Sequence, residues 1–146
     1  WWTTNDATLE ITGVQLEVGS SASAFAHETF AATLAKCQRY YVVLAHQDGS
    51  TTRSVCNLGQ YTASTAHGVV HFPVQMRVGP SLAATSGGGY YAGYGSAAGQ
   101  GFDAFALQKA TELTAELSTS LARTQGDSIF VRTNATGARL AFTADL

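Results

Sequence analysis

Charged side chains are scarce in this sequence. Only 12% of its 146 residues are Asp, Glu, Lys or Arg, about half the usual share of a soluble domain. The only lysines are Lys36 and Lys109 and the net charge is -2, so no basic surface exists that would neutralise a nucleic-acid backbone. Because 45% of the residues are hydrophobic, a monomer would expose an unusually neutral surface, and we expect partner chains to cover part of it.

Cysteine, long apolar runs and methionine are also scarce. Cys37 and Cys56 do not make a disulfide framework, and they form either one bridge or two ordinary thiols in a reducing cytoplasm. No apolar run approaches the roughly 20 residues of a membrane span, and no signal-peptide pattern opens the chain, so we predict no membrane insertion. The sequence begins with Trp1 and its one methionine is Met76, so we expect a fragment or a processed product.

The N-terminal stretch is expected to belong to an upstream unit. From Thr8 to Val18 apolar and polar residues alternate, and the phase shifts by one at Gly13, which is typical of a strand with a β-bulge. The small, polar residues from Gly19 to Ala26 predict a linker. We therefore assign residues 1–25 to a terminal strand of an upstream domain plus a linker, and residues 26–146 to a C-terminal β-sandwich domain.

Residues 26–146 favour short strands after one helix. Phe30, Leu34, Cys37 and Tyr41 recur at helical spacing among alanines, which predicts about two turns of helix giving way to a strand near Arg39. Strands are expected at residues 40–44, 69–78, 102–107, 128–133 and 138–144. Residues 113–117 fit a strand or a helical face, and their Thr and neighbouring Ser residues favour the strand. The predicted fold class is an all-β, antiparallel, jelly-roll-like β-sandwich with one short N-terminal helix.

Three segments contain residues that favour a turn, a loop or a break in strand pairing. Pro73 lies on the polar side of the 69–78 strand and cannot donate to a ladder, so it indicates an edge strand or a local break in pairing. Residues 85–101 are rich in Gly, Ser, Ala and Tyr and predict a long exposed loop. Asn134-Ala135-Thr136-Gly137 is a turn that predicts a hairpin between the last two strands.

Motifs for catalysis, metals or cofactors are weak. Residues four apart on a strand lie about 13 Å apart, too far to share an ion, so the histidines do not predict a metal site: His27, His46, His67 and His71. The G-x-G-x-x-A pattern at residues 93–98 binds a dinucleotide only between a strand and a helix. Glu112 and Glu116 would face the same way, whereas a glycosidase needs two carboxylates across a cleft. We predict no enzyme, no metal and no cofactor.

Tyr90, Tyr91 and Tyr94 form the most informative cluster. Tyrosines among glycines provide rigid amphipathic contact surface on an adaptable backbone, as in paratopes and sugar-stacking sites. These three residues are the predicted ligand-binding site. The alternative is that the rings pack on the sheet or at a subunit seam.

Residues 11–19, Ile-Thr-Gly-Val-Gln-Leu-Glu-Val-Gly, are followed by a spacer, the predicted helix and Cys37-Gln38-Arg39-Tyr40-Tyr41. This arrangement resembles a junction common in structural proteins of tailed bacteriophages and prophages. There the first stretch ends a carbohydrate-binding-like jelly roll, and the second opens a C-terminal domain of tail fibres and related appendages. Residues 72–77 with Pro80 and the final residues 140–146 are also similar to this family, whereas residues 87–123 match nothing in it.

The resemblance implies a virion protein that assembles in the bacterial host cytoplasm. The expected partners are two further copies in a homotrimer, other virion proteins and a bacterial surface polysaccharide. The first hypothesis is host-surface glycan recognition through the loops, with no bond made or broken. The second is a purely structural head fibre, connector or capsid-decorating protein. The third, a polysaccharide-cleaving tailspike, needs a long β-helix that this sequence lacks.

Overall fold

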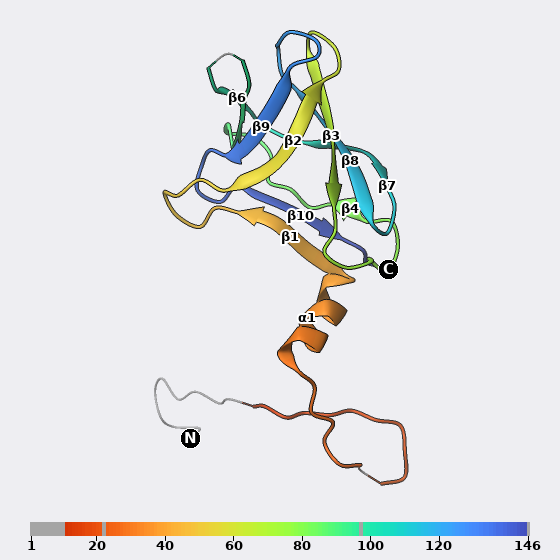
Figure 1. The fold of residues 1–146 in the computed structure, drawn as a ribbon. Coiled ribbons are helices and arrows are strands. Elements are labelled where there is room, and N and C mark those ends of the chain that lie inside the picture. The colour runs from red at the N-terminus through yellow and green to blue at the C-terminus, as the bar shows by residue number, and fades with distance from the viewer. Residues whose placement is uncertain (1–10, 22, 97, 146) are drawn as a thin grey trace.

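The computed structural model describes residues 11–21, 23–96 and 98–145 (Figure 1). One short helix precedes a β domain. In chain order the elements are α1 (Phe30–Gln38), β1 (Tyr41–His46), β2 (Ser54–Gln60), β3 (Thr65–His71), β4 (Ser81–Leu82), β5 (Tyr91–Tyr94), β6 (Gln100–Phe102), β7 (Ala106–Ala110), β8 (Thr114–Ser120), β9 (Ser128–Thr133) and β10 (Arg139–Thr143).

The strands form two antiparallel sheets. The larger sheet has seven strands in the order β6-β5-β9-β2-β3-β8-β7, and the smaller has three in the order β1-β10-β4. The larger sheet curls over the smaller one (Figure 1). The predicted all-β class, with antiparallel sheets and one short N-terminal helix, is therefore confirmed.

The space between the sheets holds one hydrophobic core. Its largest fully buried side chains include Tyr91, Phe142, Met76, Leu117, Leu121, Ile129 and Leu140. Side chains alternate along β8, where Ala115, Leu117 and Thr119 are buried and their neighbours are not. Because burying one such large apolar side chain contributes roughly 1.5 to 3 kcal/mol, this core supplies the main driving force for folding.

Helix α1 confirms the predicted two turns of helix. The Thr29 hydroxyl accepts a hydrogen bond of 3.3 Å from the amide of Ala32, which caps one of the free donors of the first turn. None of its residues is buried, and Figure 1 shows the helix standing away from the sheets below the start of β1.

The predicted C-terminal hairpin is wrong, although both of its strands exist. β9 pairs with β2 and β5 in the larger sheet, while β10 pairs with β1 and β4 in the smaller one. The turn does contain the positive φ expected of its glycine, +86° at Gly137. It carries the chain from one sheet to the other, because each strand has partners from elsewhere that local turn signals do not reveal.

The structure divides the strand expected at residues 69–78. β3 ends at His71, and the predicted break at Pro73 is confirmed. Beyond it the backbone still bonds to the β7–β8 turn, since the Met76 amide donates to the Glu112 carbonyl at 2.8 Å. The strand expected at residues 102–107 is also divided, with β6 ending at Phe102 and β7 beginning at Ala106. The strand interpretation of residues 113–117 is confirmed by β8.

The prediction of a long exposed loop over residues 85–101 is wrong in its second half. Tyr91–Tyr94 forms β5, and Tyr91, Ala92 and Gly93 are buried. Gly93 permits this packing, because a Cβ there would lie 2.9 Å from the Ile129 side chain and 3.0 Å from that of Leu121. Composition indicated a loop, but the small residues instead let a strand lie close against the core.

The predicted N-terminal strand has no partner within the described part of this chain. Residues 11–18 form no strand, and Ile11, Val14, Leu16 and Val18 are all exposed. Residues 1–10, including the start of the predicted strand, lie outside the described residues. The assignment of this segment to an upstream domain stays a prediction.

The two cysteines are free thiols in different surroundings. Cys37 is exposed on α1, whereas Cys56 is partly buried on β2, and burial raises its thiol pKa to about 12. The thiolate is the form that reacts with alkylating agents. In a Cys37→Ser variant at pH 8, we expect the folded chain to be alkylated at Cys56 roughly 100 to 1000 times more slowly than the unfolded chain. Mass spectrometry of iodoacetamide-treated samples checks this, and equal rates would contradict the burial of Cys56.

Candidate functional site

The domain has two distinct ends, which we call the base and the tip. At the base the chain enters β1 and leaves β10, and the Ala144 amide donates to the Tyr40 carbonyl at 2.7 Å. At the tip three loops come together: β2–β3, β5–β6 and β8–β9. Figure 1 shows the tip loops at the end of the domain opposite α1 and the C-terminus.

A hollow of about 490 Å³ lies between the three tip loops. We call it the tip hollow. Its lining residues are Ala63 from the β2–β3 loop, Ser96, Ala98 and Gln100 from the β5–β6 segment, and Ala122, Arg123, Thr124 and Asp127 from the β8–β9 loop. The alanines leave the space open, and the five polar residues supply both hydrogen-bond donors and hydrogen-bond acceptors. A polar, open hollow of this kind suits a hydroxyl-rich ligand better than an apolar one.

Arg123 holds the β5–β6 segment in place. Its Nη2 donates to the Gly93 carbonyl at 2.9 Å and to the Ala98 carbonyl at 2.8 Å. Its Nε and Nη1 are buried without a hydrogen-bond partner, and no carboxylate of the described residues forms an ion pair with it. A fixed positive charge that lacks a full set of acceptors therefore lies beside the tip hollow.

Asp127 and Gln60 link the other two loops. The Asp127 carboxylate accepts a hydrogen bond from the Ser96 hydroxyl at 2.9 Å, and its carbonyl accepts one from the Gln60 amide at 2.9 Å. The buried Gln60 side chain donates to the carbonyls of Leu121 at 2.6 Å and Thr62 at 2.8 Å. These bonds connect all three loops. A ligand would therefore bind a preorganised surface, and little conformational entropy would be lost in ordering the loops.

Tyr94 provides an exposed aromatic ring at the end of β5, two residues before Ser96 of the tip hollow. Tyr94 is 39% exposed. Its ring packs on Gly99, where any side chain would collide with the ring. The Arg132 guanidinium lies 5.2 Å from the Tyr94 ring centroid and 5.0 Å from that of Phe130. Both rings and the guanidinium therefore lie together on the outer face of β5 and β9.

The other two predicted tyrosines are not equivalent to Tyr94. Tyr91 is fully buried, stacks on Phe102 at 5.4 Å, and donates its hydroxyl proton to the Arg139 carbonyl at 2.8 Å. Burial raises the pKa of Tyr91 to about 12. Tyr90 is half-buried against the core. A ligand at this surface would therefore contact Tyr94 and not Tyr91, whose ring packs in the core as the alternative expectation held.

The structure does not bring the histidines and glutamates considered above for metal binding and catalysis together into one site. His67 on β3 lies 3.1 Å from the Glu116 carboxylate on β8, while Glu112 sits in the β7–β8 turn. Across the described ranges, no group of three His, Cys, Asp or Glu residues is arranged to hold a metal ion. The glycine pattern at residues 93–98 leads from β5 toward β6, so it does not open a helix as a dinucleotide site would require.

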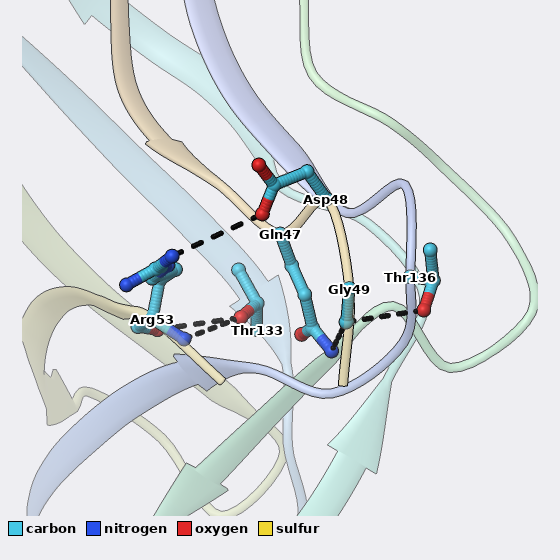
Figure 2. Close-up of polar contacts among 6 residues, drawn as sticks. All are labelled: Gln47, Asp48, Gly49, Arg53, Thr133 and Thr136. Carbon is cyan, nitrogen blue, oxygen red and sulfur yellow. Dashed lines mark hydrogen bonds and ion pairs between the residues drawn. The ribbon is translucent and has the colours of Figure 1, made fainter. Parts of the chain in front are cut away.

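A second polar cluster, at the β1–β2 loop, uses its hydrogen bonds to fasten the chain (Figure 2). The Arg53 amide donates to the Thr133 hydroxyl at 2.7 Å. The Gly49 carbonyl accepts from the Gln47 side chain at 2.8 Å and from the Thr136 hydroxyl at 3.2 Å. These bonds tie the loop to β9 and to the turn that follows it. The cluster therefore has a structural role.

Comparison with protein-family models, with curated proteins and with solved structures finds no match to this chain. None of the helices in the described segments is long and apolar enough to cross a bilayer. The residues of the tip hollow therefore have to be interpreted from their own chemistry. Sequence reasoning missed Arg123, Asp127 and Gln100, because only the folded chain brings their loops together.

Proposed function

We propose that this chain is the outward-facing domain of a tailed-phage virion appendage, which assembles as a homotrimer and binds a bacterial surface polysaccharide at the tip hollow. The observation that carries the proposal is the placement of the chain ends. α1 and the C-terminus lie at the base, so an appendage joined through residues upstream of α1 would present the tip loops to the cell surface (Figure 1).

The chemistry of the tip hollow supports a saccharide as the ligand. Sugars combine hydroxyl groups with apolar ring faces, and proteins bind them with fixed polar groups beside an exposed aromatic ring. Ser96, Gln100, Thr124 and Asp127 supply the polar groups, and Tyr94, at the end of the strand that leads to Ser96, is the candidate for the ring. The chain's own hydrogen bonds already order the loops that carry them.

Binding without cleavage is the activity that fits these residues. Among the described residues that line the hollow, Asp127 is the one carboxylate, and it accepts a hydrogen bond from Ser96. Glycoside hydrolysis ordinarily needs two carboxylates about 5 to 10 Å apart on either side of the bond. The proposal therefore includes no catalytic residue and no cofactor.

A purely structural role in a head fibre, connector or capsid-decorating protein is the second candidate. The observation that favours it is Tyr91, which packs in the core and leaves the predicted tyrosine cluster with one exposed ring. In that case the tip hollow would have no ligand, and the exposed apolar residues would serve contacts between virion proteins.

Substitutions at the tip hollow distinguish the two candidates. We expect Tyr94→Ala and Gln100→Ala each to weaken binding to the recognised polysaccharide at least about tenfold, because each removes a direct contact. Binding of the labelled chain to an array of purified bacterial surface polysaccharides measures this. The control is Tyr40→Ala at the base, where the tyrosine is 49% exposed and, like Tyr94, lies against an arginine, with Arg77 5.8 Å from its ring centroid.

The control variant should retain wild-type binding and both tip variants should keep the wild-type mass and thermal transition. Binding that survives both tip substitutions would reject the hollow as the site. If the wild-type chain binds neither the polysaccharides on the array nor bacterial cells, the structural candidate is favoured instead.

A further inference from the structure

Helix α1 exposes an apolar stripe that no other part of the described chain covers. Phe30 is 81% exposed and Leu34 is 41% exposed, and Cys37 is also exposed. The helix contacts the domain only near its C-terminal end, where it runs into β1. Apolar side chains gathered on one face of an isolated helix indicate a surface that another molecule buries.

The spacing of the stripe is that of a coiled-coil seam. On α1, Phe30, Leu34 and Cys37 are separated by steps of four and three residues, which is the alternation of a and d positions in a heptad. A helix with this spacing is complementary to a parallel copy of itself, because each knob fits between the residues of the same seam on the neighbour. The face therefore fits a second copy of this chain.

Helix length gives an independent reason for a partner. Nine residues span only about 13 Å, and isolated helices shorter than about 12 residues are marginal in water. The described chain adds little tertiary support, since none of the nine residues is buried. Packing against identical helices would supply the missing burial.

The charges around the stripe permit close approach of identical copies. The residues beside the seam, Ala31, Thr33 and Gln38, are uncharged. The one charged residue of the helix, Lys36, pairs with Glu28 within its own chain, so parallel copies would not repel one another. An acidic or basic partner helix would find no complementary charge on this face.

We infer that the α1 helices of neighbouring copies pack in parallel around the symmetry axis of the proposed homotrimer, with Leu34 and Cys37 innermost. The inference rests on the assembly part of the proposed function, and it does not depend on a ligand at the tip. It places the subunit contact at the base, so the three tip hollows stay uncovered and a weak saccharide site gains avidity.

A charge placed in the seam should dissociate the assembly. We expect the wild-type chain to have a mass near three times 15.3 kDa by light scattering behind a sizing column, and Leu34→Asp to have the monomer mass. The matched control is Ala32→Asp, which places the same charge on the opposite face of the helix and near its N-terminus, where an acid is favourable. Circular dichroism should report the same strand content for all three proteins.

Disulfide trapping tests the contact without perturbing the fold. Two Cys37 thiols can be bridged only if their Cα atoms come within about 7 Å, which the seam position would allow. Mild oxidation of the Cys56→Ser variant should give a covalent dimer of twice 15.3 kDa on a denaturing gel, and the Cys37→Ser variant should give none.

These measurements can overturn the inference separately from the tip proposal. A monomeric wild-type chain, an assembled Leu34→Asp variant, or an assembled chain that forms no Cys37 dimer would each reject α1 as the subunit contact. None of these results would decide whether the tip hollow is the saccharide site, which the Tyr94 and Gln100 variants measure independently.

Discussion

Replacing Phe142 with alanine is expected to lower the free energy of unfolding by about 3 to 5 kcal/mol. Phe142 is completely buried on β10 and packs edge-to-face against Phe72, with ring centroids 5.0 Å apart. Its strand lies between β1 and β4, and Leu140 and Ala141 beside it are also fully buried. The smaller sheet cannot collapse into the space left by the ring, so the cost includes a cavity as well as lost burial.

Equilibrium urea unfolding followed by fluorescence measures this effect. Phe25→Ala provides a matched control, because Phe25 lies in the segment before α1 and its ring packs edge-to-face on His27 outside the β domain. We expect that control to change the free energy of unfolding by no more than about 0.5 kcal/mol. A Phe142→Ala variant within 1 kcal/mol of the wild type, on the order of the smallest core effects, would contradict the packing described for β10.

Replacing Arg123 with methionine is expected to loosen the tip, with a local cost of about 2 to 4 kcal/mol. Methionine keeps much of the volume but removes the two charge-assisted hydrogen bonds to the Gly93 and Ala98 carbonyls. The loss is partly offset, because the substitution also removes two buried N–H groups that have no partner. Saccharide binding at the tip hollow should fall together with the order of the β5–β6 segment.

Hydrogen exchange at the ladder amides of β5 and β6 reports this loosening, and exchange in β3 and β8 should stay unchanged. Arg132→Met is the matched control, because Arg132 is exposed and contacts only the faces of Tyr94 and Phe130 among the described rings. If both variants exchange at the same rate as the wild type, Arg123 does not hold the tip together.

Local pattern predicted much of the fold because alternation and helical spacing are local properties. The helix at Phe30–Gln38 follows from its alanines and its Thr29 cap, and β8 and β9 follow from residues that alternate between core and surface. Pro73 indicated a break in pairing because it has no amide hydrogen to donate. The predictions were wrong where strand partners distant in the sequence decided the pairing, as at the turn that ends at Gly137. They were also wrong where small residues packed against the core, as in β5.

The candidate site was predictable only in part. Tyr94 was identified because tyrosines among glycines are typical of contact surfaces, but the same signal selected Tyr91, which faces inward on β5. Arg123 and Asp127 carry no distinguishing pattern in the sequence. Their importance comes from hydrogen bonds to residues about 25 to 70 positions away along the chain, such as Ala98 and Gln60.

The sequence by itself determined the all-β class, the single helix and the low surface charge, because composition and periodicity act within a few residues. Only the tertiary structure decided which strands share a sheet, which tyrosine reaches solvent and which polar groups line the tip hollow. Those outcomes depend on pairing between distant segments, where the free energy comes from burying one shared core. Local propensity does not encode such pairing.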